Sequence, residues 1–371
     1  MRYTVEYRNK EHITGLTRAI SQMTTRAWRI MEICGGQTHA IARYRLEDML
    51  PHGIRLLHGP GCPVCVTPEG LVDCAIALAT DSGATLATFG DMMRVPGSRG
   101  TLMEARAEGA DVRVMYAPLD AVALAAATPG REVVFFAIGF ETTLAAHLAA
   151  LSEAVRRGLG NFSLLTSFFT VPPAMEAILS DPSCEVDAFL AAGHVCAVTG
   201  YAGYRRIAET FARPVVVTGF EPADLLYGIY HSVRLLEGGE TRAVVNAYRR
   251  AVSEEGNLRQ QALINEMLEP SDGEWRGIGL LPSGCLRLRK PYEGYDAIVK
   301  FALRDAAGER TSASATGCMA GEIMLGKKLP AECPHFGADC LPDHPAGAPM
   351  ASTEGVCAAY YRYRTSKTIN I

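Results

Sequence analysis

The sequence lacks any hydrophobic run long enough to span a bilayer, which takes about 20 predominantly apolar residues. Its most apolar windows, 121–127 and 133–140, are much shorter than that. The first twelve residues, MRYTVEYRNKEH, are polar and lack the apolar stretch of a secretory signal peptide. These absences predict a cytoplasmic protein that does not associate with a membrane.

A strong excess of charge of either sign is also missing. The 36 Lys and Arg residues nearly balance the 40 Asp and Glu residues, which leaves a formal net charge of −4. A basic footprint typical of nucleic-acid binders is therefore absent, and we expect no nucleic-acid partner. The sequence also contains no Walker-type or G-x-G-x-x-G fingerprint, which disfavours a nucleotide-binding enzyme.

Cysteine is too scarce for a disulfide scaffold, because such chains contain more than about 8–10% of it. There are 11 cysteines in 371 residues, at positions 34, 62, 65, 74, 184, 196, 285, 318, 333, 340 and 357. An odd number of cysteines in a long chain without an export signal is more typical of metal ligands or redox-active thiols than of structural bridges.

The hydrophobic content of 48% supports a sizeable core, and the length suggests two or three domains. Short, continuous apolar runs alternate with amphipathic stretches, a pattern typical of βαβ units with buried parallel strands. The strands are expected at 54–57, 85–89, 112–116, 132–138, 162–169, 186–191 and 214–218. The predicted fold class is therefore α/β with mainly parallel sheets.

The turn Gly-Phe-Glu follows two of these strands, at 139–141 and at 219–221. The repetition suggests two similar α/β lobes, predicted at 40–128 and 129–219. Residues 1–39 and 220–371 form a predicted third domain, which is helical at 224–236, 242–253 and 258–268 and then irregular and rich in Gly, Pro and Cys from residue 282. Because an irregular tail builds little core, a metal cofactor is the natural candidate to hold it together.

Four cysteines of this tail, Cys318, Cys333, Cys340 and Cys357, have the spacing C-x14-C-x6-C-x16-C. Four thiolates are the usual ligands of a [4Fe–4S] cluster or of a structural zinc ion. Zinc sites usually contain short C-x2-C knuckles, which are absent here. The wide spacing favours the cluster, while zinc and unligated thiols remain alternatives.

Nearer the N-terminus, Cys62 and Cys65 form a C-x2-C motif inside Gly-Pro-Gly-Cys-Pro-Val-Cys, directly after a predicted strand and close to a helix start. A helix N-terminus lowers the pKa of a thiol and makes it a better nucleophile. The motif predicts a redox dithiol, and half of a zinc knuckle is the alternative.

The other dense motif is Cys34-Gly-Gly-Gln-Thr-His39, in which two glycines leave the sulfur and backbone amides of Cys34 open to a ligand. His39 is a candidate for orienting a group or moving protons. At other strand ends, His194 is either a proton donor or a turn cap. Asp91 and Glu141 either accept a hydrogen bond from His39 or a ligand, or cap a helix.

Taken together these motifs resemble the family of the hydrogenase maturation protein HypD. The matching stretches, which cover essentially the whole chain, are CGGQTH at 34–39, HGPGCPVC at 58–65, TFGDMMRVPG at 88–97, AIGFETT at 137–143, AGHV at 192–195, TGFEP at 218–222 and the four C-terminal cysteines in order.

The resemblance implies a redox-active assembly scaffold rather than a conventional turnover enzyme. With a small HypC-type chaperone, such a protein carries the Fe(CN)2CO unit of [NiFe]-hydrogenase while it is built, and a HypE-type partner donates the cyanide. The hydrogenase large subunit is then an indirect partner. By the same resemblance, Cys34 is the iron ligand, Cys62 and Cys65 are the redox dithiol, and the four C-terminal cysteines hold a [4Fe–4S] cluster that supplies electrons.

Two other functions remain open on the residues alone. An iron–sulfur-dependent thiol–disulfide reductase would use the cluster and the dithiol but leave the Cys34 motif without a role. A zinc-stabilised α/β binding module would carry out no electron transfer.

Overall fold

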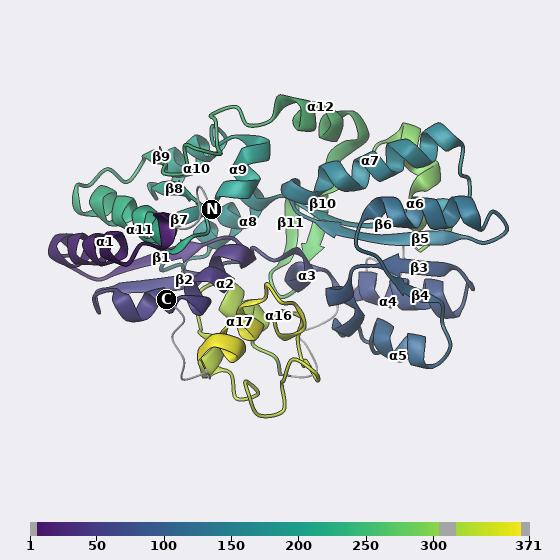
Figure 1. Cartoon of the computed structure of the whole chain (residues 1–371), viewed down its shortest axis with the longest axis horizontal. Helices are drawn as coiled ribbons and strands as arrows, with labels where there is room; N and C mark the ends of the chain where they lie inside the picture. Colours follow the sequence, from purple (N-terminus) through teal and green to yellow (C-terminus); the bar gives the residue numbers. More distant parts are fainter. Residues whose placement is uncertain (1–5, 304–316, 365–371) are drawn as a thin grey trace.

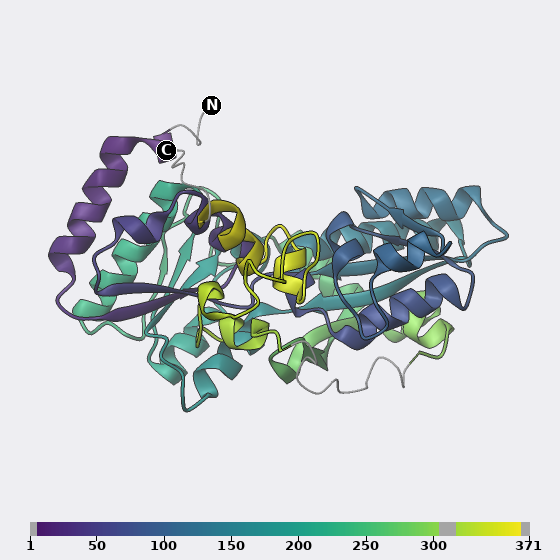
Figure 2. The ribbon, with the colours of Figure 1, turned by 90° about the horizontal axis from the view of Figure 1, so that it is seen from below.

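The computed structural model describes residues 6–303 and 317–364, and it has two α/β lobes side by side along the long axis of the molecule (Figure 1). Each lobe is built around one β-sheet. A segment at the C-terminal end of the described chain crosses the junction between the lobes, as the view from below shows (Figure 2). Among residues 6–303 and 317–364, no helix combines the length and the apolar character that a membrane span needs.

The first sheet is parallel throughout, with the strand order β2-β1-β7-β8-β9. Its strands are β1 (Trp28–Glu32), β2 (Ile54–His58), β7 (Ala188–Ala192), β8 (Val215–Thr218) and β9 (Val244–Asn246). Every residue of β7 and β8 is buried, as expected for central strands covered on both faces. The predicted parallel α/β character is confirmed here.

The second sheet is mixed, with the strand order β10-β11-β6-β5-β3-β4. The strands β3 (Thr85–Thr88), β4 (Val112–Val114), β5 (Val133–Gly139) and β6 (Phe162–Phe169) are parallel to one another. The hairpin of β10 (Leu268–Trp275) and β11 (Gly279–Leu288) adds antiparallel to β6. The parallel parts of the two sheets share one order, β2-β1-β7-β8 in the first and β4-β3-β5-β6 in the second.

Helices connect the strands and cover the sheets. In the first half of the chain they are α1 (Lys10–Met23), α2 (Gly35–Arg43), α3 (Pro63–Val66), α4 (Glu69–Thr80), α5 (Leu102–Ala107), α6 (Pro118–Ala127), α7 (Glu141–Arg157) and α8 (Val171–Ser180). In the second half they are α9 (Gly193–Thr199), α10 (Tyr204–Phe211), α11 (Pro222–Glu237), α12 (Leu258–Met267), α13 (Ala297–Lys300), α15 (Ala320–Met324), α16 (Ala348–Ala351) and α17 (Val356–Arg364). Short 3-10 turns lie at η1 (Glu6–Arg8), η2 (Leu46–Met49), η3 (Gly90–Arg94), η4 (Lys290–Tyr295) and η5 (Pro330–Glu332).

Two parts of the predicted third domain differ from the structure. The helix predicted at 242–253 is wrong, because Val244–Asn246 extends the first sheet as β9 and turns follow it. The stretch expected to be helical and then irregular contains the β10–β11 hairpin. Its Pro270, Gly273 and Pro282 argue against strands in sequence, but Pro is tolerated on edge strands and beside irregular pairing.

The sheets draw their strands from across the predicted domain ranges. Strand β2, from the range 40–128, pairs with β1, whereas β5 and β6, from the range 129–219, pair into the sheet of β3 and β4. The chain thus crosses between the lobes more than once. The domain limits at 39, 128 and 219 stay a prediction, since strand pairing does not by itself define an independently folding unit.

The C-terminal segment packs on the elements that follow β1 and β2. Helix α17 lies against α2, and α16 lies against α3 and η3. A cluster of buried side chains holds this contact together, and it includes Ala42 of α2 and Val356, Ala359 and Tyr360 of α17. This packing places α17, which carries Cys357, beside the helix that follows β1.

Candidate functional site

Cys34 lies where the strand order of the first sheet reverses. The chain leaves β1 toward β2 on one side and later returns to β7 on the other, so the ends of β1 and β7 form the switch point of the sheet. In open α/β sheets this is the usual ligand position. Cys34 is the N-cap of α2, two residues after the end of β1, and His194 is the second residue of α9, which follows β7 directly. Their side chains meet there: Cys34 Sγ lies 3.8 Å from each ring nitrogen of His194.

The thiol of Cys34 is almost completely buried, with 2% of its surface exposed. Burial raises its pKa far above the usual value, and the nearby carboxyl groups of Glu32 and Glu354 act in the same direction. Backbone amides of Gly36 and Gln37 at the start of α2 partly oppose this shift. The thiol is therefore protonated at neutral pH. It loses the proton when a base accepts it and a bound cation takes its place.

His194 is partly buried and stacks on the ring of Phe220, with 4.9 Å between the ring centroids. Burial lowers the pKa of His194 to about 4, so its imidazole is neutral at neutral pH. A neutral imidazole has one nitrogen that can accept a hydrogen bond from the thiol of Cys34. The structure thus brings these two predicted site residues together at the switch point of the first sheet.

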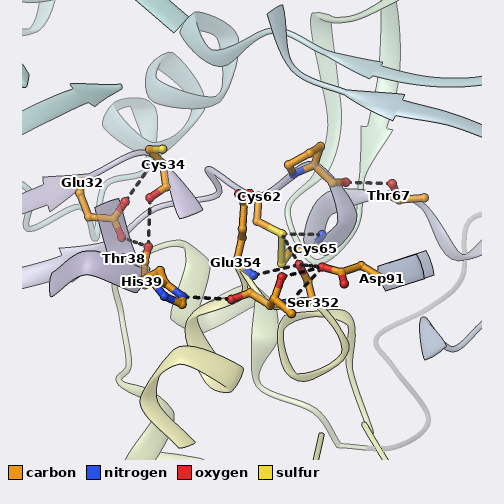
Figure 3. The surroundings of a disulfide bond; sticks show 12 residues. Glu32, Cys34, Thr38, His39, Cys62, Cys65, Thr67, Asp91, Ser352 and Glu354 are labelled. Carbon is orange, nitrogen blue, oxygen red and sulfur yellow. Dashed lines mark hydrogen bonds between the residues drawn. A yellow bond between two sulfur atoms is a disulfide. The ribbon is translucent and has the colours of Figure 1, made fainter. Parts of the chain in front are cut away.

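The motif of Cys62 and Cys65 packs directly against the Cys34 loop (Figure 3). The amide of Gly35 donates a hydrogen bond of 3.0 Å to the carbonyl oxygen of Gly61. A Cβ atom at Gly61 would lie 2.2 Å from the Cα of Cys34, so only glycine allows this approach. Gly35, which follows Cys34, and Gly61, which precedes Cys62, therefore allow the two loops to touch.

Cys62 and Cys65 are joined by a disulfide, with 5.2 Å between their Cα atoms. Cys62 caps the N-terminus of α3, and the amide of Cys65 donates a hydrogen bond of 3.2 Å to its sulfur. Cys62 Sγ also lies 3.4 Å from the hydroxyl group of Ser352 in the C-terminal segment. Both cysteines are buried, with 4% and 2% of their surfaces exposed.

Asp91 and His39 hold the same C-terminal loop from two sides (Figure 3). One carboxylate oxygen of Asp91 accepts hydrogen bonds from the Ser352 hydroxyl at 3.2 Å and from the amide and hydroxyl of Thr353 at 3.0 Å each. His39 Nδ1 lies 3.3 Å from the Thr353 carbonyl oxygen, and its Nε2 lies 3.1 Å from the Tyr363 hydroxyl. In this arrangement Asp91 fastens the loop, and His39 contacts the loop rather than the Cys34 thiol.

The loop held by Asp91 and His39 places Glu354 between the two cysteine motifs. A Cβ atom at Gly35 would lie 2.7 Å from the Glu354 carbonyl oxygen and 3.3 Å from Cys62 Cβ. Burial raises the pKa of Glu354, and the charge of Asp91 adds to the effect. A small cavity beside this contact is lined by residues that include Gly35, Cys62, Cys65 and Glu354.

The four C-terminal cysteines come together from 318 to 357 and line one cavity, together with Phe336 and Met350. Burial raises the pKa of Cys357, and the three other thiols add to this by their mutual repulsion. The donor set fits an iron–sulfur cluster, which takes four thiolates. However, within residues 6–303 and 317–364 no group of three or more His, Cys, Asp or Glu side chains has the geometry to hold a metal ion. The cluster stays a prediction.

Glu141 lies at the start of α7, after β5 in the second lobe. His194 has the comparable place after β7 in the first lobe. Glu141 does not reach His39; its Oε1 instead accepts a hydrogen bond of 3.0 Å from the amide of Val171. Its Oε2 is buried and has no hydrogen-bond partner among the described residues. Burial raises the pKa of Glu141 to about 7.

Glu32 and Tyr360 were not predicted as site residues, and His58 appeared only as part of a matching motif. All three are buried close to the thiol groups. A signal was present, since Glu32 ends an apolar stretch and a buried charged group needs partners. Cys34 and Thr38 are local partners of Glu32, but His58 lies 26 residues away, and Tyr360 lies 302 residues beyond His58, so the sequence alone does not identify the complete set.

Comparison with known proteins gives one consistent family. Residues 11–364 match the HypD family model, described as "Hydrogenase formation hypA family". A hydrogenase maturation factor HypD of Rhizobium leguminosarum bv. viciae is 46% identical over 98% of this chain and 96% of that protein. HypD of Escherichia coli (strain K12) is 42% identical over 99% of this chain and 100% of that protein. HypD of Rhodobacter capsulatus is 43% identical over 98% of both chains.

Proposed function

The chain belongs to the HypD family of hydrogenase maturation factors, and from this premise we propose that it is the scaffold on which the Fe(CN)2CO unit of [NiFe]-hydrogenase is assembled. The observation that carries the proposal is the meeting of three thiol groups at one place. The Cys34 loop touches the Cys62–Cys65 loop, and the C-terminal segment with its four cysteines closes over both.

Cys34 is the proposed iron ligand on this chain, shared with a cysteine of a HypC-type chaperone. Iron with cyanide and carbonyl ligands prefers soft, electron-rich donors such as thiolate. Because burial keeps the free thiol protonated, iron binding must release a proton, and the neutral ring of His194 lies within hydrogen-bonding distance to receive it. Burial also keeps water away from the bound iron unit.

The disulfide between Cys62 and Cys65 is the proposed electron store beside Cys34. Taking up two electrons and two protons would convert it to two thiols. Cys318, Cys333, Cys340 and Cys357 are the residues that would hold a [4Fe–4S] cluster, which supplies the electrons when bound. The contact of Cys62 Sγ with Ser352 supports a link, because Ser352 lies on the segment between the cavity of the four cysteines and the disulfide.

The proposed partners follow from this role. A HypC-type chaperone supplies the second iron ligand, a HypE-type protein delivers cyanide, and the hydrogenase large subunit receives the finished unit indirectly. Release of cyanide from a carrier and its capture on iron need both electrons and a dry site. The dithiol formed when the Cys62–Cys65 disulfide takes up two electrons and two protons would supply the electrons, and the burial of Cys34 excludes water.

A second function, iron–sulfur-dependent thiol–disulfide reduction, is favoured by the disulfide itself and its closeness to the C-terminal segment. It gives no role to the contact between Cys34 and His194. Turnover of unrelated protein disulfides would support it. Zinc in place of iron would support instead a zinc-stabilised binding module.

The test is an infrared spectrum of the chain purified anaerobically together with its HypC-type partner. We expect cyanide and carbonyl stretching bands in the wild type and their loss in Cys34→Ala. Cys184→Ala is the matched control, since Cys184 is a partly buried thiol in the loop before β7 and should keep the bands. Bands that persist in Cys34→Ala would rule out Cys34 as the iron ligand.

A further inference from the structure

The elements that carry the three thiol groups share one buried chain of hydrogen bonds. Glu32 is the last residue of β1 and His58 is the last residue of β2, and they are direct partners across the two strands. Glu32 precedes Cys34 by two residues, and His58 precedes Cys62 by four. Tyr360, which completes the chain, lies on α17 three residues after Cys357.

Glu32 is the centre of this chain. One carboxylate oxygen accepts a hydrogen bond of 2.7 Å from the amide of Cys34, and the other accepts from the hydroxyl of Thr38 and contacts His58 Nδ1 at 2.8 Å. With only 1% of its surface exposed, Glu32 has no access to water as a substitute partner. A carboxylate accepts hydrogen bonds but does not donate them. His58 Nδ1 therefore carries a proton and donates a hydrogen bond to Glu32.

Tyr360 connects the far side of His58 to α17. Its hydroxyl lies 2.7 Å from His58 Nε2 and 3.0 Å from each carboxylate oxygen of Glu47, which also pairs with Arg364. Burial raises the pKa of Tyr360 well above the ordinary range, so the hydroxyl keeps its proton and remains a donor. The contacts thus extend from the Cys34 amide through Glu32, His58 and Tyr360 to Glu47, a partly exposed carboxylate. Because the Tyr360 hydroxyl has one proton, it donates at any moment either to His58 Nε2 or to Glu47.

A buried chain of this kind resists independent movement of its parts. If α17 shifts, Tyr360 leaves His58, and a buried polar atom loses its partner, which is costly. A shift of α17 that keeps these hydrogen bonds instead carries His58 and Glu32 with it, and through them the amide of Cys34. Because these side chains are buried in surroundings of low polarity, each hydrogen bond between them is stronger than the same bond would be in water.

We propose that Glu32, His58 and Tyr360 are positioning residues that couple the placement of α17, and with it Cys357, to the backbone of Cys34. A change at the C-terminal cysteines then reaches Cys34 and the Cys62 loop without direct contact between the sulfurs. The inference relies on the proposed function only for its biological meaning, since the hydrogen bonds lie within this protein and involve neither a partner nor iron.

The test is the rate at which iodoacetamide alkylates Cys34 in the native, anaerobically purified full chain, followed by peptide mass spectrometry. Tyr360→Phe removes one hydroxyl and should raise this rate about fivefold or more, because losing one buried hydrogen bond shifts local opening by that much. Cys74 is the internal reference: it is also buried, at 1% exposure, but lies on α4 in the second lobe. Its rate should stay within about twofold.

The matched control is Tyr292→Phe. Tyr292 also donates its hydroxyl to a carboxylate, Glu266, at 3.2 Å, but it lies on η4 in the second lobe. We expect no change in Cys34 alkylation for this variant. If Tyr360→Phe does not give a cooperative thermal unfolding transition, Glu47→Gln replaces it and weakens the same chain from its surface end.

A double-mutant cycle separates coupling from general loosening. His58→Gln and Tyr360→Phe act on one chain, so the double variant should alkylate at Cys34 no faster than the faster single variant. Fully multiplied effects, equal acceleration of Cys34 and Cys74, or an unchanged Cys34 rate would each overturn the proposal. The readout needs neither iron cargo nor partner, so its failure and failure of the scaffold function are distinguishable.

Discussion

The two lobes share one strand order but place different chemistry at the point where that order reverses. In the first lobe, the ends of β1 and β7 carry Cys34 and His194, which lie in contact. In the second lobe, the ends of the corresponding strands β3 and β5 carry Asp91 and Glu141. One switch point therefore presents a thiol and an imidazole, and the other presents two carboxyl groups.

This difference indicates a division of labour between similar folds. Asp91 uses its carboxylate to fasten the C-terminal loop over the thiols of the first lobe. Glu141 is buried, and one of its carboxyl oxygens has no hydrogen-bond partner among the described residues. The first lobe and the C-terminal segment thus carry the thiol groups, and Asp91 of the second lobe joins His39 of the first lobe in holding the segment in place. Each prediction below tests one part of this assignment.

The largest expected effect comes from the C-terminal segment. We expect Cys333→Ala to lose the iron–sulfur cluster and to destabilise the C-terminal segment, because an irregular stretch with few helices depends on its metal for order. Anaerobic iron and sulfide analysis with visible absorbance measures this, and Cys285→Ala, which changes a thiol on β11, serves as the control. A Cys333→Ala protein with full cluster absorbance would show that the ligand set is wrong.

The next effect is a pH dependence that belongs to the second lobe. The pKa of Glu141 is raised from 4.5 to about 7 in the folded chain, so the stability that comes from its neutral form is present below pH 4.5 and is lost as pH rises through 7. At about 1.4 kcal/mol per unit, wild type should lose up to about 3 kcal/mol relative to Glu141→Gln between pH 5 and pH 8.

Urea unfolding at both pH values measures this difference in the free energy of unfolding. Glu153→Gln is the control on the same helix, because its neighbours Arg156 and Arg157 lower the pKa of Glu153 to about 2 and keep it ionised throughout this range. A Glu141→Gln variant whose stability runs parallel to that of wild type would show that Glu141 is not held neutral by burial.

The smallest effect concerns the fastening of the loop. Asp91→Ala should cost about 1–3 kcal/mol, because donors on Ser352 and Thr353 lose their acceptor, and it should make the loop easier to cleave by protease. Asp91→Asn keeps one acceptor oxygen and should lie closer to wild type. Equal protease resistance in wild type and Asp91→Ala would remove the holding role from the second lobe.

Continuous apolar runs made the parallel strands predictable, and the run 162–169 matches β6 residue for residue. Strand β1 was not predicted, since its five residues include Arg29 and end in Glu32. The β10–β11 hairpin was also not predicted, because its Pro and Gly residues break every local strand signal. Strand β1 depends on pairing with β2 and β7, whereas β10 and β11 pair mainly with each other and join the sheet through β6.

The reactive residues themselves were predictable from short motifs, whereas their contacts were not. Spacing identified Cys62 with Cys65 and set Cys34 apart beside two glycines. The contact of Cys34 with His194 spans 160 residues, and that of Asp91 with Ser352 spans 261. Such contacts follow from the strand order and from the path of the C-terminal segment, neither of which a local pattern contains.

The most direct test of the scaffold function is metal and sulfide analysis combined with infrared spectroscopy on the wild-type chain, purified anaerobically with its HypC-type partner. The account predicts about four irons with matching sulfide for the cluster, one further iron, and cyanide and carbonyl bands from that further iron. Four irons without such bands, under conditions in which the partners are active, would contradict the scaffold function and favour the thiol–disulfide reductase. Zinc in place of iron would contradict both.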